Sequence, residues 1–256
     1  KLDRMTISCE IQPMMFAVPD PHVAGPFEAF DAIWFDSGDF SDWWNGGWRY
    51  ETYLSQEFPG YLEERFGART DKWGRATVGY STGGWGAAVV ALRNPDRFGA
   101  TVPMSAILSL RYQGGTPYKT PDEQPYWTDP TQPFLSQNIF TALAVHGFLD
   151  ALGPDLENWK AHNPADIAAG MTDADFAGNI FMAAGDSDHF QLVSHMRDMQ
   201  RIFDARGVRY WALHSADGPH REAFWRPVLD IALPFLSRAF RGEPQPPLTQ
   251  TAISPP

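Results

Sequence analysis

Short apolar runs alternate along this chain with longer stretches in which apolar positions recur at helical spacing. A short apolar run bounded by turn residues is typical of a buried strand, whereas recurrence every three or four positions is typical of an amphipathic helix. Strands that alternate with helices form a mostly parallel sheet covered by helices on both faces. We therefore expect an α/β fold, with strands at 14–18, 75–80, 101–105, 180–184 and 210–214, and helices at 49–66, 85–94, 190–206 and 222–240.

Several segments lack such a period. Residues 21–48 are rich in Gly, Asp and aromatic side chains and are expected to form a loop. Residues 111–137 carry many Pro, Gly, Thr and Asp, as irregular insertions that cap a site often do. Residues 138–169 are weakly helical. Repeated Pro, Thr and Gln indicate a flexible tail over 242–256, so we expect one domain over 1–241.

Composition narrows the class of protein. With 256 residues and 43% hydrophobic content, the chain can bury one sizeable core. Its net charge of −11 disfavours a nucleic-acid partner, because the average surface field repels a polyanion. The single cysteine, Cys9, excludes an intrachain disulfide and a cysteine-based zinc cluster. No apolar run is long enough to cross a bilayer, so we expect a soluble protein. The compartment stays open, with secretion slightly favoured over the cytoplasm.

The segment Gly79-Tyr80-Ser81-Thr82-Gly83 matches G-x-S-x-G and lies between a predicted strand and a predicted helix. A serine on such a tight bend is held in a strained conformation, and flanking glycines let the chain pass closely. This exposes the Ser81 hydroxyl as a nucleophile, while the Thr82 N–H at the helix start can stabilise an oxyanion. The alternative is an incidental serine in a glycine-rich turn, and the flanking strand and helix argue against it.

A serine nucleophile needs a base and an acid, which follow it in the order serine, acid, histidine in hydrolase folds. Among the seven histidines, His220 lies in a loop between the last predicted strand and the last predicted helix, where it can reach over the edge of the sheet. The acid is expected in Gly185-Asp186-Ser187-Asp188, which follows a predicted strand. Either aspartate could serve; we favour Asp188, with Asp186 as turn former or helix cap.

The ten tryptophans are an unusual number for this length. Trp211 and Trp225 are expected to fill the core. Trp43, Trp44 and Trp48 lie in the Gly- and Asp-rich loop, where two interpretations stand: packing under the loop, or stacking on a sugar or acyl group of a substrate. The aspartates of the same loop lack the glycine and glutamate of a calcium-binding loop, so we expect no metal.

Further motifs accompany the serine, acid and histidine segments. They are Met14-Met15-Phe16-Ala17-Val18-Pro19-Asp20, Trp34-Phe35-Asp36-Ser37, Tyr50-Glu51-Thr52-Tyr53-Leu54, Asn94-Pro95-Asp96-Arg97-Phe98, and Gly218-Pro219-His220 with Phe224-Trp225. From about Leu2 to Phe240 the chain resembles the esterases related to esterase D, which include S-formylglutathione hydrolases, feruloyl and acetyl esterases and bacterial mycolyltransferases. The resemblance implies an α/β-hydrolase fold, with the family's acid at Asp188 and its base at His220.

Two departures from the family pattern bear on the expected activity. Family members have an H-G-containing strand and loop before the first segment seen here, and that loop donates the second oxyanion amide. The missing strand would lie between residues 14–18 and the strand before Ser81, so its absence would leave central backbone groups unpaired. We therefore hypothesise that the chain is an N-terminally truncated piece of a longer protein, lacking the N-terminal strands. Thr82 replaces the methionine common after the nucleophile, where only the backbone is needed.

The sequence thus predicts a serine esterase that hydrolyses carboxylic esters through an acyl-enzyme intermediate, without a cofactor. The expected substrate is a small-molecule or carbohydrate ester. One alternative is an acyltransferase of the mycolyltransferase type, but nothing in residues 111–137 identifies an acceptor site. The other is a non-catalytic carbohydrate-binding module on the same fold. The set of Ser81, Asp188 and His220 argues against the module.

Overall fold

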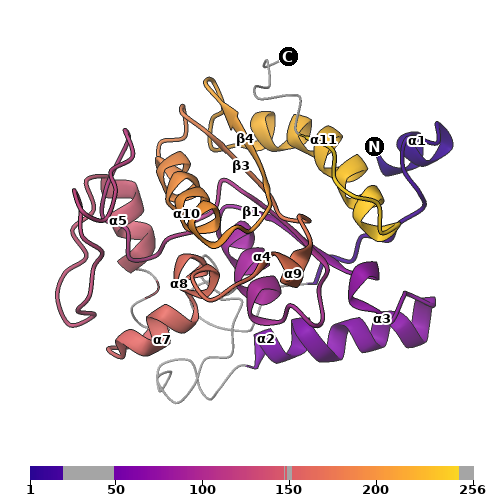
Figure 1. The fold of residues 1–256 in the computed structure, drawn as a ribbon, viewed down its shortest axis with the longest axis horizontal. Coiled ribbons are helices and arrows are strands. Elements are labelled where there is room, and N and C mark those ends of the chain that lie inside the picture. The colour runs from indigo at the N-terminus through magenta and orange to yellow at the C-terminus, as the bar shows by residue number, and fades with distance from the viewer. Residues whose placement is uncertain (20–48, 147, 149–151, 248–256) are drawn as a thin grey trace.

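Four parallel strands form the centre of the fold (Figure 1). The structure, a computed structural model, describes residues 1–19, 49–146, 148 and 152–247. Each of its strands begins and ends within one residue of an expected one, so four of the five expected strands are confirmed. In sheet order they are β1 (Ala76–Tyr80), β2 (Ala100–Met104), β3 (Phe181–Gly185) and β4 (Trp211–Ser215).

The carboxyl ends of these strands meet at one edge of the sheet. β1 pairs with β2 so that Tyr80 is opposite Met104, and β3 pairs with β4 so that Gly185 is opposite Ser215. A contact between β2 and β3 joins the two pairs. Because all four strands run in the same direction, the loops that follow them leave from this edge, which is where open α/β sheets place their sites.

Helices cover the sheet on both faces. α4 (Thr82–Arg93) and α10 (Leu192–Arg206) share a core with Met182 of β3 on one face, and α11 (Glu222–Phe240) shares a core with Phe181 on the other. Successive strand side chains point to opposite faces, so one apolar run supplies both cores. The predicted α/β architecture is confirmed.

The remaining helices are shorter. The helix expected at 49–66 is present as three consecutive pieces, of which the middle one is π-helical, and it ends at Gly67, whose φ of 68° is left-handed. These pieces are α2 (Tyr50–Thr52), η1 (Tyr53–Glu57) and α3 (Phe58–Phe66). The others in the described ranges are α1 (Leu2–Ile7), η2 (Lys72–Gly74), α5 (Ile139–His146), α7 (Leu156–Ala161), α8 (Pro164–Ala168) and α9 (Asp173–Phe176).

The prediction of a strand at residues 14–18 is wrong. This segment has no strand pairing, and the side chains of Met15, Phe16 and Val18 are exposed. A strand needs a neighbour to satisfy its backbone N–H and C=O groups, and within the described ranges β1 pairs with β2 alone. The apolar run therefore has the composition of a buried strand, but among the described residues it has no neighbouring strand to pair with.

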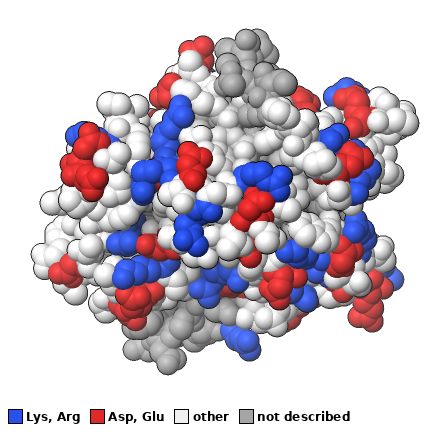
Figure 2. Space-filling model, viewed as in Figure 1, with Lys and Arg blue, Asp and Glu red and all other residues white. Residues whose placement is uncertain are grey.

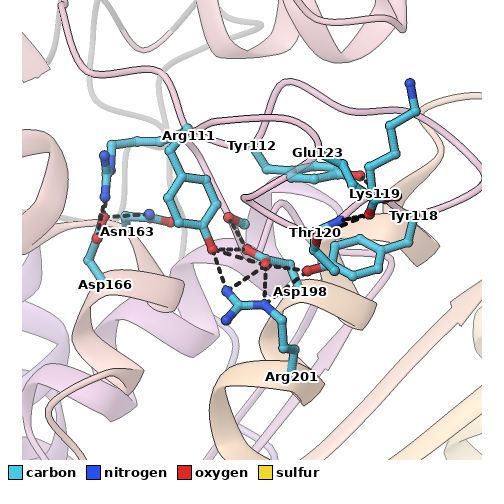
Figure 3. A network of polar contacts seen from close by, with 12 residues as sticks. Arg111, Tyr112, Tyr118, Lys119, Thr120, Glu123, Asn163, Asp166, Asp198 and Arg201 are labelled. Atoms are coloured by element: carbon cyan, nitrogen blue, oxygen red, sulfur yellow. Dashed lines mark hydrogen bonds and ion pairs between the residues drawn. The ribbon is translucent and has the colours of Figure 1, made fainter. Parts of the chain in front are cut away.

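Buried polar contacts anchor the irregular insertion to the body of the molecule (Figure 3). Tyr118 donates a hydrogen bond of 2.8 Å to the carboxylate of Asp198 on α10. Tyr126 donates another, of 2.7 Å, to the same carboxylate. Ser109 donates a third, also of 2.8 Å, and the guanidinium of Arg201 lies 3.0 Å from the same carboxylate. These donors offset the cost of burying the Asp198 charge, so the insertion is held by its tyrosines as well as by apolar packing.

Acidic and basic side chains are interspersed over the face of the molecule in Figure 2. The net charge of −11 is therefore not gathered into one acidic patch on that face. No helix in the described part of the chain is both long enough and apolar enough to span a membrane.

The residues just after α11 lie against the body. The indole Nε1 of Trp211 donates to the Pro246 carbonyl at 2.9 Å, and Gln245 Nε2 donates to the Phe235 carbonyl at 3.0 Å. The remainder of the expected tail, 248–256, lies outside the described residues, as does the loop expected at 21–48.

Candidate active site

Ser81 lies on the sharp turn between β1 and α4, with φ of 56° and ψ of −128°. These angles are strained for a residue with a side chain, and the Ser81 N–H is held by the Met104 carbonyl at 2.9 Å. A Cβ at Gly79 would lie 2.1 Å from the Gly83 carbonyl oxygen, and a Cβ at Gly84 would lie 2.9 Å from the Met104 oxygen. Glycine is therefore required where the strand, the turn and the helix pass one another.

His220 reaches Ser81 from the loop between β4 and α11. Its Nε2 atom lies 2.8 Å from Ser81 Oγ, although the two residues are 139 positions apart. They meet because both follow strands whose carboxyl ends share one edge of the sheet. The His220 side chain is 9% exposed, while Ser81 is partly accessible to solvent.

Asp188 holds the other side of the imidazole. Its Oδ2 atom lies 2.8 Å from His220 Nδ1, and its Oδ1 atom accepts the backbone N–H of Phe190 at 2.9 Å. A carboxylate can only accept a hydrogen bond, so this contact places the imidazole proton on Nδ1. Nε2 is then the acceptor for the Ser81 hydroxyl.

The second aspartate of the same loop, Asp186, has a different partner. Its Oδ1 atom lies 2.7 Å from Nε2 of His214, and both side chains are partly exposed. Of the two aspartates that the sequence left open, the structure therefore joins Asp188 to His220. The loops that carry the acid and the histidine pass so closely that a Cβ at Gly185 would lie 2.2 Å from the Gly218 carbonyl oxygen.

Three aromatic rings surround His220. The ring centres of Phe190, Trp225 and His189 lie 4.6, 5.2 and 5.6 Å from the centre of its imidazole. Such contacts limit the orientations open to the imidazole and shield it from water.

Trp225 also connects His220 to the serine turn. Its ring stacks on Tyr80 at 4.1 Å, and its Nε1 donates a hydrogen bond of 3.0 Å to Ser105 Oγ. Ser105 is fully buried and has a positive φ of 44°. The sequence predicts Trp225 as core filling and misses its contact with His220; its place in the first turn of α11, just after the histidine loop, was the available signal.

Thr82 is the first residue of α4, so its N–H has no carbonyl one turn earlier to bond. The amino end of a helix carries partial positive charge, which suits this amide to a developing oxyanion. The expected substrate contacts Trp43, Trp44 and Trp48 lie outside the described residues.

A hydroxyl, an imidazole and a carboxylate are thus bonded in series, with a helix amide beside the hydroxyl. In such a series the imidazole can take the serine proton as the oxygen attacks, and the carboxylate can stabilise the imidazolium that forms. The arrangement is able to perform acyl transfer.

Comparison with known proteins finds a protein family whose model matches this chain. The model of the family described as "Putative esterase" matches residues 29–236. The MPT51 antigen of Mycobacterium leprae is 27% identical over 184 residues, which are 59% of this chain and 54% of that protein. The MPT51/MPB51 antigen of Mycobacterium tuberculosis is 29% identical over 124 residues, 47% of this chain and 34% of that protein. The chain thus spans about half the length of the first curated relative and less of the second.

Solved structures share the fold. A ferulic acid esterase matches with a TM-score of 0.61 at 23% identity, over 93% of this chain and 76% of its own. An S-formylglutathione hydrolase from Agrobacterium tumefaciens matches with a TM-score of 0.58 at 16% identity, over 81% and 62%. MPT51 of Mycobacterium tuberculosis matches with a TM-score of 0.55 at 21% identity, over 75% and 69%. The expected α/β-hydrolase fold is confirmed.

Proposed function

Because this chain belongs to the esterase family, we propose that it cleaves carboxylic esters through an acyl-enzyme intermediate, with Ser81 as the nucleophile. The observation that carries the proposal is the pair of 2.8 Å contacts from Ser81 through His220 to Asp188. Small-molecule and carbohydrate esters are the proposed substrates. The roles proposed for Ser81, His220 and Asp188 require no cofactor.

Acylation begins when Ser81 Oγ attacks the ester carbonyl carbon while its proton passes to His220 Nε2. The carbonyl oxygen becomes an oxyanion, which accepts a hydrogen bond from the Thr82 N–H. The C–O bond to the alcohol then breaks, and His220 Nε2 returns the proton to the departing oxygen. Ser81 is left esterified to the acyl group.

Deacylation repeats these steps with water. His220 takes a proton from a water molecule, whose oxygen attacks the acyl carbon, and then returns the proton to Ser81 as the free acid leaves. Asp188 accepts the Nδ1–H bond throughout, which keeps Nε2 directed at Ser81 and offsets the imidazolium charge.

The direct test compares the protein with its Ser81→Ala variant. The unchanged protein should be labelled by a fluorophosphonate probe and should hydrolyse short p-nitrophenyl esters, whereas Ser81→Ala should show no labelling and at least about 10³-fold lower kcat. Ser187→Ala is the matched control, because Ser187 is an exposed serine whose hydroxyl, among the described residues, bonds only the Ala216 carbonyl at 3.4 Å. Equal labelling of the protein and Ser81→Ala would contradict the proposal and leave the binding-module alternative.

Hydrolysis and acyl transfer differ in the second half-reaction alone. With a p-nitrophenyl ester and an added sugar acceptor, we expect the acyl group to appear as the free acid. An acylated sugar as the main product would replace hydrolysis by the transferase alternative, while the roles of Ser81 and His220 would stand.

A further inference from the structure

Three large apolar side chains stand exposed at and just before the start of α5. Leu135, Ile139 and Phe140 are exposed by 73%, 65% and 47%, and we call them the apolar lip. Isolated exposed apolar residues are ordinary, but three within six positions of the chain are a candidate for contact with an apolar ligand.

Buried hydrogen bonds hold the lip against the loop that carries the acid. Asn138 Nδ2 donates to the His189 carbonyl at 2.8 Å, and Thr141 Oγ1 donates to the Phe190 carbonyl at 2.5 Å. Both donors are buried, and Asn138 Oδ1 also accepts the Thr141 N–H at 3.0 Å, which caps α5. Consistent with these bonds, α5 lies beside α10 in Figure 1. The start of α5, which carries Ile139 and Phe140, is therefore fixed relative to the site.

Two aromatic bridges connect the lip to His220. The Phe140 ring centre lies 5.0 Å from that of His189 and 5.9 Å from that of Phe190. These two rings lie 5.6 and 4.6 Å from the His220 imidazole. Ring contacts thus run without a break from the proposed base outward to Phe140.

The chemistry of acylation tells which half of an ester would lie there. His220 Nε2 must come within hydrogen-bond reach of the departing alcohol oxygen, whereas the carbonyl oxygen turns towards the Thr82 N–H. The alcohol half of the substrate is therefore the half beside His220. We propose that the apolar lip binds the hydrocarbon part of the alcohol, so that the enzyme prefers esters of apolar alcohols. This proposal rests on the esterase function proposed above and specifies its substrate.

Two series of esters separate the alcohol side from the acyl side. The alkyl acetates from methyl to hexyl lengthen only the alcohol, and the methyl alkanoates from acetate to octanoate lengthen only the acyl group. The quantity to compare is kcat/KM, which reports the steps through acylation, in which the alcohol leaves. We expect kcat/KM to rise about threefold per methylene buried along the alkyl acetates, and to rise less along the alkanoates.

Phe140→Ser tests the lip itself. It should lower kcat/KM for hexyl acetate at least about tenfold and leave methyl acetate within about twofold, because only the longer alcohol reaches the lip. Ile139→Ser, at the most exposed helical position of the lip, should act in the same direction without touching the ring bridges. Phe66→Ser is the matched control: Phe66 is 58% exposed at the end of α3, outside the lip. It should leave both series unchanged.

The outcomes are distinct. If Phe140→Ser removed the dependence of kcat/KM on chain length for the methyl alkanoates but not for the alkyl acetates, the acyl group would lie on the lip and the proposal would be overturned. Equal effects of Phe140→Ser and Phe66→Ser, or no effect of Phe140→Ser and Ile139→Ser in well-folded proteins, would also overturn it. Failure of the esterase function would look different, since no ester of either series would then be cleaved in a Ser81-dependent manner.

Discussion

Two buried aspartates, Asp188 just before α10 and Asp198 within it, are bonded in different ways. Asp188 accepts one imidazole N–H and one backbone N–H. Asp198 accepts three hydroxyl groups and pairs with a guanidinium. Both carboxylates satisfy the rule that a buried charge must be hydrogen-bonded, but only Asp188 bonds a group that changes its protonation in the proposed reaction.

The difference lies in what the partners can do. Burial and the bond to Asp198 raise the pKa of Tyr118 to about 12, and burial raises the pKa of Tyr126 further. Both tyrosines therefore keep their protons at neutral pH and act as fixed donors. A carboxylate surrounded by fixed donors stabilises a fold, whereas one bonded to an imidazole can support proton transfer. Variants of each aspartate should therefore separate activity from stability.

The largest effect is expected from Asp188→Asn. An amide NH₂ facing Nδ1 would favour the imidazole tautomer with its proton on Nε2, which cannot accept the Ser81 proton, so kcat should fall about 10⁴-fold. The midpoint of thermal unfolding should change little, because size and burial are kept. Asp186→Asn, on the same loop but bonded to His214, is the control and should keep its kcat. A large loss of stability in Asp188→Asn would contradict the distinction between Asp188, which supports proton transfer, and Asp198, which stabilises the fold.

Asp198→Ala should produce the opposite pattern. It removes the carboxylate that accepts three hydroxyl groups and pairs with Arg201, and leaves that guanidinium with only the Tyr118 and Tyr126 hydroxyls as acceptors among the described residues. The free energy of unfolding, measured by urea denaturation, should fall by about 4 kcal/mol. Below the unfolding transition, kcat should stay close to that of the unchanged protein. Asp204→Ala on the same helix removes an exposed carboxylate that, in the described part of the chain, accepts only the Tyr210 hydroxyl. It should lower the free energy of unfolding by about 1 kcal/mol. A kcat loss in Asp198→Ala as large as in Asp188→Asn would erase the distinction.

A pH effect on stability is expected from His195, which lies between the two aspartates in sequence. Burial lowers the pKa of His195 to about 4, against the opposing charges of Asp198 and Asp188. Below pH 6.5 the unfolded chain binds a proton that the folded chain refuses. Stability is therefore complete above that pH and is lost as the pH falls towards 4, by about 3 kcal/mol in all. Urea denaturation at several pH values should show this fall in the free energy of unfolding, and His195→Met should make the fall smaller. The same fall in His195→Met as in the unchanged protein would show that His195 is not its cause.

The smallest effect concerns the ring that supports His220. Trp225→Phe keeps an aromatic ring but removes the bond to Ser105, and should lower kcat about tenfold with KM nearly unchanged, because the imidazole loses orientation rather than the substrate losing contacts. Ser105→Ala should behave alike, and the double variant should be no worse than either single one. Trp211→Phe loses a comparable indole bond, to Pro246, and is the control. Additive losses in the double variant would contradict a shared cause.

The sequence by itself determined the local elements and the turn that carries Ser81. Apolar periodicity placed four strands within a residue of their positions, since period and flanking turn residues are local properties. The glycines around Ser81 predicted a close passage of strand and helix, and chain order predicted His220 as its partner. These predictions depend on residues near one another in sequence, or on an order common to the whole fold.

Only the tertiary structure decided the partners that are distant in sequence. It paired Asp188 with His220 and Asp186 with His214, a choice that depends on how closely two loops approach at Gly185 and Gly218. It also brought Tyr118 and Tyr126 onto one carboxylate and left residues 14–18 without a ladder. Composition cannot reveal such outcomes, because the same side chain is stabilised or left exposed according to which neighbours the packing of the sheet brings to it.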